Sequence, residues 1–286
     1  MKTIVIGAGS HLGVHIDGAA FGAEHLVRKA GEQPHRLFMQ DLDFVKSKAA
    51  DDLRKNEKEI EKYNTALYQL MLTEIQNGAF PILLGGDHSV AVASALASNQ
   101  VHGDLGIIWL DAHTDFNTFA STVTGNIHGL PLAAITGYHC EELRTFHKGP
   151  VIDPHKAVVV GARAVDPEEW TNLRDAGVTV FTTEDIQLMG ASEVMERAFR
   201  IAGEKAHVSY DLDLIDPKTA PGVSVPETEG ISEQEAMDLV AELTRNIDKI
   251  VSFDLVELNP LRDLNGRTED LAVRILDQIM EAVKNK

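Results

Sequence analysis

Hydrophobic and polar residues follow two alternating patterns along the chain, which predict strands and helices in turn. Short apolar runs predict buried strands at 2–7, 80–84, 107–110, 156–161, 178–181, 208–210 and 250–256. Between them, apolar residues recur at helical spacing and predict helices at 18–30, 51–77, 89–97, 128–136, 167–176, 192–203, 232–246 and 267–283. This alternation predicts an α/β fold with a mostly parallel sheet covered on both faces. No linker or repeat interrupts it, so we expect a single domain over residues 1–286.

Acidic and histidine side chains follow three of the predicted strands. Asp111, His113 and Asp115 come directly after the run 107–110, at alternate positions that a strand end places on one side. His88 follows the strand 80–84 and a glycine pair, and a third segment contributes Asp211 and Asp213. Sites in parallel sheets lie beyond the carboxyl ends of the strands, so we expect these six side chains to meet there.

Four carboxylates and two imidazoles in one cleft predict a metal centre. Six ligands exceed the four that a structural zinc ion takes, and they suit two cations that share bridging carboxylates. Oxygen-rich ligands with some imidazole favour manganese, magnesium or iron, while zinc and cobalt stay possible. Single Asp or Ser residues after strands often only begin helices. Three such segments at three strand ends favour the metal centre over simple capping.

Composition narrows the class of protein. A net charge of −18 argues against nucleic-acid binding, because phosphates would be repelled. The single cysteine, Cys140, excludes an intrachain disulfide and fits a reducing compartment. The apolar runs are strand-length, and no signal peptide or membrane span is visible. The composition therefore agrees with a cytoplasmic enzyme.

The three segments 85–89 (GGDHS), 111–117 (DAHTDFN) and 209–217 (SYDLDLIDP) resemble the signatures of the ureohydrolase family. The resemblance implies a three-layer α/β/α sandwich with about eight mostly parallel strands, two Mn²⁺ ions per chain, and a homo-oligomer, either a trimer or a hexamer. It also implies that His88, Asp111, Asp115 and Asp211 hold one ion, and that Asp111, His113, Asp211 and Asp213 hold the other.

The resemblance further implies catalytic roles beyond the metal ligands. Glu257, in a segment similar to the family's Glu-Asn-Pro motif, would pair with a guanidinium group, and Asp254 would support it. His128 resembles the histidine that passes protons to the leaving amine. Asp115 would serve catalysis as well as metal binding. A metal-bridging hydroxide would be the nucleophile.

The substrate expected from the resemblance is L-arginine, cleaved to L-ornithine and urea. Asn117, Thr124 and Asn126 would bind the α-carboxylate, and Asp166 with Glu169 would meet the α-amino group. Asp166 before a proline also fits a helix N-cap. Val225 stands where the family usually has a threonine that supports the substrate-binding glutamate. This departure leaves open an agmatinase, a guanidino-acid hydrolase or a formimidoylglutamase. A metal-binding scaffold without catalysis is disfavoured by the intact motifs.

Overall fold

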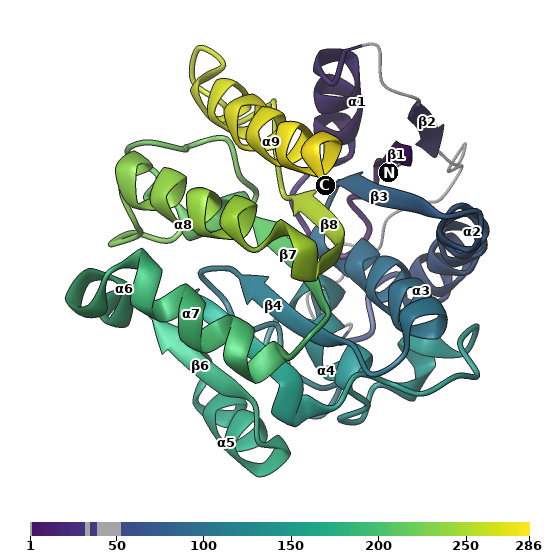
Figure 1. Ribbon diagram of the computed structural model, residues 1–286. Helices are drawn as coiled ribbons and strands as arrows, with labels where there is room; N and C mark the ends of the chain where they lie inside the picture. Colours follow the sequence, from purple (N-terminus) through teal and green to yellow (C-terminus); the bar gives the residue numbers. More distant parts are fainter. Residues whose placement is uncertain (1, 32–34, 39–52) are drawn as a thin grey trace.

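One parallel sheet organises the chain. The computed structural model describes residues 2–31, 35–38 and 53–286. Its sheet has eight strands in the order β2-β1-β3-β8-β7-β4-β5-β6, and every neighbouring pair is parallel. The strands are β1 (Lys2–Ala8), β2 (His35–Phe38), β3 (Ala79–Gly85), β4 (Gly106–Leu110), β5 (Ala157–Ala162), β6 (Thr179–Thr182), β7 (Ala206–Asp211) and β8 (Ile250–Val256). The α/β class and the parallel sheet predicted from the sequence are confirmed (Figure 1).

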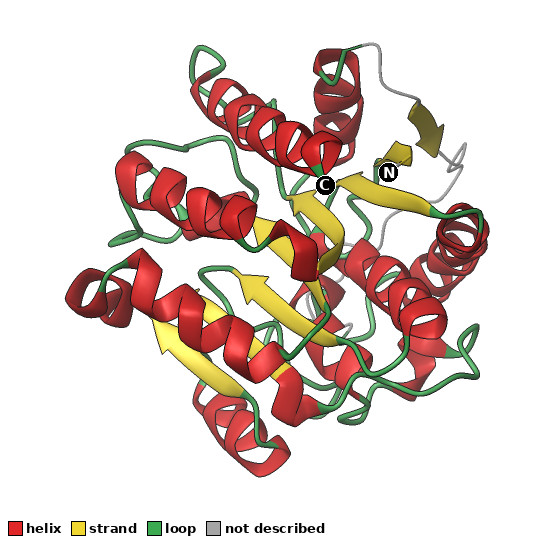
Figure 2. Cartoon of the chain, in the orientation of Figure 1, coloured by secondary structure: helices red, strands yellow, loops and turns green. Residues whose placement is uncertain are grey.

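Helices cover both faces of the sheet, as Figure 2 shows. They are α1 (Ala20–Lys29), α2 (Glu57–Gln76), α3 (Ala91–His102), α4 (Pro131–Thr136), α5 (Pro167–Ala176), α6 (Thr183–Met189), α7 (Ala191–Ala202), α8 (Glu233–Arg245) and α9 (Arg267–Asn285). Two separate hydrophobic cores result. One joins the sheet to α1, α7, α8 and α9, and the other joins it to α2, α3 and α4. This arrangement is the expected three-layer sandwich.

Short 3₁₀ helices occupy several of the connections. They are η1 (His88–Val90), η2 (Ile127–Gly129), η3 (Glu141–Arg144), η4 (Pro154–Lys156), η5 (Leu212–Leu214) and η6 (Ile247–Lys249). Two regular elements were not predicted, β2 and α6. Strand β2 is an edge strand of four residues without a long apolar run, and α6 is a short helix joined to α7 through Gly190. The start of the helix predicted at 51–77 lies outside the described residues, and α2 begins at Glu57.

The turn after β3 is packed against the turn after β1 at the carboxyl edge of the sheet. The Gly86 amide donates to the Ala8 carbonyl at 2.9 Å, and a Cβ on Gly86 would lie 1.9 Å from the Ser10 carbonyl oxygen. Only glycine permits so close a backbone approach. The turn therefore holds the residues that follow it, including His88, at a fixed place. In the described part of the chain, no helix has both the length and the apolar composition needed to cross a bilayer.

Candidate active site

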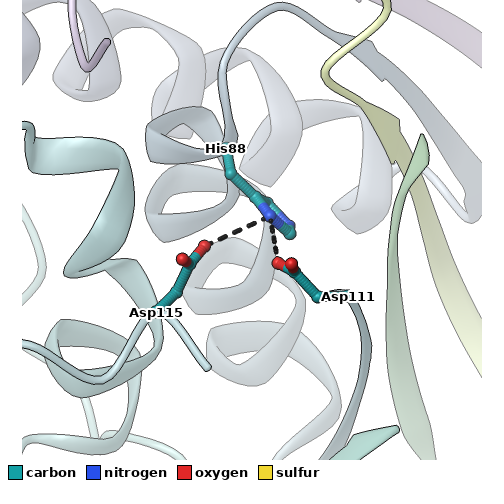
Figure 3. A group of neighbouring side chains, drawn as sticks. All are labelled: His88, Asp111 and Asp115. Carbon is teal, nitrogen blue, oxygen red and sulfur yellow. Dashed lines mark ion pairs between the residues drawn. The ribbon is translucent and has the colours of Figure 1, made fainter. Parts of the chain in front are cut away.

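The six predicted metal ligands lie together beyond the carboxyl ends of β3, β4 and β7. His88 begins η1 after β3, Asp111 directly follows β4, Asp211 ends β7 and Asp213 lies in η5. Ligand atoms of His88, Asp111 and Asp115 lie within 4.8 Å of one another, as do those of Asp111, His113 and Asp213 (Figure 3 shows the first group). The structure thus brings the predicted residues together, and their role as metal ligands stays a prediction.

Asp111 lies between the two histidines. Its Oδ2 is 3.0 Å from His88 Nδ1, and its Oδ1 is 3.5 Å from His113 Nδ1. Asp211 Oδ2 is 3.1 Å from His88 Nδ1, whereas Asp211 Oδ1 accepts a hydrogen bond from the Asp213 amide at 2.8 Å. Asp213 Oδ2 lies 3.0 Å from His113 Nδ1. The contacts therefore divide the cluster into an inner half around His88 and an outer half around His113, joined by Asp111.

The donor set fits divalent cations. His88 Nδ1 lies 3.0–3.3 Å from oxygens of Asp111, Asp115 and Asp211, yet among the described residues it makes no hydrogen bond of acceptable geometry. All four carboxylates are almost fully buried. Buried carboxylates that point at one another and at an imidazole nitrogen are costly without a cation between them. The cluster can therefore bind metal, with oxygen and nitrogen donors that suit a hard to intermediate ion.

Three buried contacts hold the inner half in place. Trp109 Nε1 donates to Asp111 Oδ2 at 2.9 Å. The Trp109 ring stacks on the His88 ring, with centroids 3.8 Å apart and planes 10° apart. The second ring nitrogen of His88, Nε2, is hydrogen-bonded to Ser209 Oγ at 2.9 Å. Partners that hold the second nitrogen of a ligating histidine fix its orientation and its tautomer.

The crowded charges shift the pKa values of the metal-free cluster. Burial raises the pKa of Asp115 to about 7, and the neighbouring Asp111 charge adds to that. Burial also raises the pKa of Asp211. Burial alone would lower the pKa of His88, but its contacts with Asp111, Asp115 and Asp211 outweigh burial and raise it well above its usual range. Without a cation, the cluster therefore retains protons at pH values where isolated carboxylates have lost them.

Two residues of the site have a left-handed backbone that side chains other than glycine rarely adopt. Asp115 has φ 49° and Glu257 has φ 66°. Each such position costs on the order of 1–3 kcal/mol and persists only where the surroundings enforce it. The Asp115 carbonyl accepts hydrogen bonds from the Leu132 and Ala133 amides at the start of α4, and the Glu257 amide donates to Gly86. These bonds hold both carboxylates toward the cluster.

Glu257 links the metal cluster to His128. Its Oε1 accepts hydrogen bonds from the His88 amide at 2.9 Å and from His128 Nδ1 at 3.0 Å. Its Oε2 is buried and has no hydrogen-bond partner among the described residues. Burial would lower the pKa of His128, but the bonded Glu257 outweighs burial and raises it. Asp254, expected to support Glu257, instead bonds to His207 and Ser94 in the core.

A cavity of about 350 Å³ opens beside the cluster. It is lined by His113, Asp115 and His128 at the chemical end and by all five residues predicted to bind the substrate tail, namely Asn117, Thr124, Asn126, Asp166 and Glu169. Asn117 Nδ2 donates to Asp166 Oδ2 at 3.0 Å. The structure therefore gathers the predicted substrate-binding residues around one cavity, and their roles stay predictions.

Glu169 already has protein partners for both oxygens. Its Oε1 accepts from Thr114 Oγ1 and the Phe116 amide, and its Oε2 accepts from the Asp166 amide, which completes a capping box at α5. Burial raises its pKa. Glu169 therefore fixes the loop that carries Asp115 to Asn117, besides facing the cavity.

Three residues near the site were not predicted from the sequence. Ser209 supports His88, while His15 and Glu227 line the cavity. Asn126 Nδ2 donates to His15 Nδ1 at 2.9 Å, and Glu227 Oε1 lies 3.8 Å from His113 Nε2. Ser209 shares the alternate spacing of Asp211 and Asp213, which is a usable signal. His15 and Glu227 lie in loops without periodicity, so the sequence offered no signal for them.

The fold is an arginase-like α/β/α sandwich, and a cluster of carboxylates and histidines that could hold metal lies beyond its strand ends. A family model described as "Arginase family" matches residues 1–281. A Bacillus subtilis arginase is 33% identical over 273 residues, which span 94% of this chain and 92% of that protein. The crystal structure of an arginase from Bacillus cereus has a TM-score of 0.87 at 32% identity and covers 98% of both chains.

The chain therefore belongs to the arginase family of ureohydrolases, which are hydrolases acting on C–N bonds in linear amidines. The crystal structure of a formimidoylglutamase from Bacillus subtilis is also similar, with a TM-score of 0.80 and 99% of this chain covered. At 18% identity, that likeness shows the fold alone. The family identified from the sequence motifs is confirmed.

Proposed function

We propose that the chain is an arginase that hydrolyses L-arginine to L-ornithine and urea with two Mn²⁺ ions per chain. Membership of the arginase family and the ligand cluster support this function. The observation that carries it is the state of Glu257. Its Oε1 is bonded to the His88 amide and to His128, whereas its Oε2 is buried and has no hydrogen-bond partner among the described residues. A guanidinium group offers the N–H donors that such a carboxylate needs.

The residues that would hold the two cations follow the two halves of the cluster. His88, Asp111, Asp115 and Asp211 would hold one, and Asp111, His113, Asp211 and Asp213 the other. When bound, divalent ions supply a nucleophile at neutral pH, because they lower the pKa of water from 15.7 to about 7. Manganese is the proposed ion because carboxylates with some imidazole suit it.

The remaining residues bind, orient and transfer protons. Glu257 holds the guanidinium so that its carbon faces the cluster, and Asp115 is proposed to hold the attacking water by a hydrogen bond. His128 is bonded through Nδ1 to Glu257, and this bond raises the pKa of the His128 imidazole. It can then give a proton to the leaving amine nitrogen, which becomes the side-chain amine of ornithine.

The far end of the cavity is proposed to recognise the amino-acid head. Asn117, Thr124 and Asn126 would donate to the α-carboxylate, and Asp166 would accept from the α-amino group. The hydrogen bond between Asn117 and Asp166 keeps these donors and acceptors side by side. Glu169 holds Asp166 and the 114–116 loop in place by hydrogen bonds. We propose that it also belongs to the substrate-binding residues at this end of the cavity.

Another ureohydrolase is the second candidate, and Val225 favours it. Val225 lines the cavity with an apolar side chain where a hydroxyl could have supported Glu257. The neighbouring Ser224 does not bond to Glu257: its Oγ accepts from Asn259 Nδ2 at 3.1 Å, and Glu257 Oε2 has no hydrogen-bond partner among the described residues. A hydrogen bond to a charged group is typically worth about 1.5–3 kcal/mol, which is enough to shift substrate preference.

A substrate panel tests the proposal. Manganese-incubated protein is given L-arginine, agmatine, a guanidino acid or formiminoglutamate, and the product is measured, with Glu257→Gln as the matched variant. We expect urea from L-arginine at the highest kcat/KM and almost none from the variant. Urea from agmatine without urea from L-arginine would overturn the arginase assignment in favour of the second candidate.

The resemblance also supports a cytoplasmic homo-oligomer of single-domain subunits, either a trimer or a hexamer. Light scattering of the purified protein measures this directly. A mass equal to one subunit at micromolar concentration would contradict it.

A further inference from the structure

We propose that Glu227 is a positioning residue for the outer metal site and fixes the ring of His113. The inference rests on the proposed metal centre, because His113 is assigned there as a ligand. Glu227 belongs to the loop after β7 and η5, and none of the predicted roles used it. Glu227 and His15 are the ionisable cavity-lining residues that the motifs did not suggest.

The two ring nitrogens of His113 face opposite partners. Nδ1 lies 3.0 Å from Asp213 Oδ2 and 3.5 Å from Asp111 Oδ1, inside the cluster. Nε2 lies 3.8 Å from Glu227 Oε1. If Nδ1 binds a cation, the ring proton must be on Nε2, which then becomes a donor. An ionised carboxylate 3.8 Å from Nε2 attracts the ring proton to that nitrogen and so favours the tautomer that leaves Nδ1 for the metal.

Ala164, the residue paired with His113, has no side-chain acceptor to offer the imidazole ring. His113 pairs with Ala164 in an isolated parallel bridge, and the Ala164 amide donates to the Ala112 carbonyl. Ala164 has only a methyl group to present to the imidazole. Among the described residues, Glu227 supplies the one acidic oxygen within ion-pair distance of Nε2. The second contact of this histidine therefore comes from a distant part of the chain.

Arg163 ties the Glu227 loop to the ligand segment. Its Nη2 donates to the Glu227 carbonyl at 2.9 Å and to the Asp213 carbonyl at 2.8 Å. Its Nε donates to the Thr228 carbonyl at 3.0 Å, and its Nη1 donates to the Leu214 carbonyl at 3.0 Å. One guanidinium thus joins the backbone of Glu227 to the backbone of a metal ligand. The carboxylate of Glu227, 38% exposed, can adjust by side-chain rotation while its backbone stays in register with the site.

His88 provides the contrast that identifies this role. Its second nitrogen meets a neutral, buried hydroxyl at 2.9 Å, whereas that of His113 faces a partly exposed carboxylate. A charged acceptor makes an imidazole a stronger ligand than a neutral one does. We therefore infer that Glu227 sets the ring orientation of His113 and strengthens its binding of a cation. Buried packing holds the His113 ring less than it holds the His88 ring.

Manganese titration of the metal-free protein tests this role without substrate. Isothermal titration calorimetry gives the affinities, and Glu227→Ala removes the acceptor, while Glu227→Gln keeps an acceptor without the charge. The matched control is Glu229→Gln, an equal charge change on the same loop at an exposed residue. We expect Glu227→Ala to weaken one of two manganese sites by about 10–100-fold, Glu227→Gln to recover part of that loss, and Glu229→Gln to match the wild type.

The alternative role for Glu227 is direct contact with a cationic substrate, since it lines the cavity. That role predicts unchanged manganese affinities in Glu227→Ala with a higher KM, and this result would overturn the inference. Equal weakening by Glu229→Gln would also overturn it, because general charge would then be the cause. Two manganese sites that respond as predicted, in a protein that releases no urea from L-arginine, would uphold Glu227 and refute the arginase proposal.

Discussion

The two histidines of the cluster follow strands of one sheet, yet their surroundings differ. The His88 side chain is 1% exposed, stacks on Trp109 and is bonded to the buried Ser209. The His113 side chain is 23% exposed, and its outer nitrogen faces Glu227 from a loop. The inner half of the site is thus an extension of the hydrophobic core. The outer half depends on charged contacts near the surface.

This difference indicates how each half keeps its geometry. Close packing fixes His88 before any cation arrives, because a buried, stacked ring has few alternative positions. His113 has more freedom, so its ordering depends on the loop that Arg163 holds. We expect the inner cation to bind more tightly and the outer one to be lost first on dialysis.

Asp111→Asn should have the largest effect, because Asp111 contacts both halves. The change removes a charge that faces His88 and His113, and with it the means of producing a nucleophile at neutral pH. We expect urea release to fall by at least about 10³-fold and both manganese affinities to weaken. Activity assays with metal analysis measure this. A variant that loses only the outer cation would show that the two halves are independent.

His128→Asn should give the next largest loss. His128 is bonded to Glu257 beside the inner half and is not itself a predicted ligand. Loss of a general acid typically costs about 10²–10⁴-fold in rate, while the manganese content should stay at the wild-type value. The matched control is His139→Asn, an exposed position with φ 59°, which Asn tolerates. Loss of metal in His128→Asn would contradict the separation of roles.

Manganese affinity of the inner half should depend on pH. The pKa of Asp115 is raised to about 7, so the metal-free carboxyl holds a proton below that pH. Because the ligand form is the carboxylate, the cation must displace that proton, and the proton on Asp115 should lower the affinity by up to about tenfold per pH unit below 7. Titrations at several pH values measure the slope. In Asp115→Asn the slope should decrease, and an unchanged slope would assign the proton to another group.

Ser209→Ala should have the smallest effect on the site, seen mainly as stability. The change leaves His88 Nε2 buried without its partner, which typically costs about 1–3 kcal/mol. Ser252→Ala is the control, since the buried Ser252 Oγ has no hydrogen-bond partner among the described residues. Denaturant unfolding of the metal-free proteins compares them. Equal losses in both variants would indicate a packing effect without a role for the hydrogen bond.

The ligand residues of both halves were predictable from the sequence, but the loop partner of His113 in the outer half was not. Apolar runs followed by alternate ligands predicted β3, β4 and β7 together with the side chains at their ends, because the period of a strand fixes which residues share a side. The family motifs supplied His128 and Glu257. Glu227, the partner of His113, lies in a loop whose backbone Arg163 joins to that of Asp213 by hydrogen bonds. These contacts are tertiary, so no local sequence pattern predicts them.

The same limit explains the missed elements. Strand β2 is a short edge strand, and α6 is a short helix closed by Gly190, so neither carries a long periodic signal. The predicted capping role of Asp166 is confirmed, because it forms a capping box with Glu169 at α5. The sequence could not show that the same Glu169 also holds Thr114 and the Phe116 amide, which is a tertiary contact.

Six side chains from three strand ends are proposed to hold a pair of divalent cations, and the proposed function depends on this pair. The most direct test is the number of manganese ions bound per chain, measured by equilibrium dialysis of the metal-stripped wild-type protein and elemental analysis. We expect two ions per chain, bound with unequal affinities. Saturation at one ion, or no specific binding at all, would contradict it.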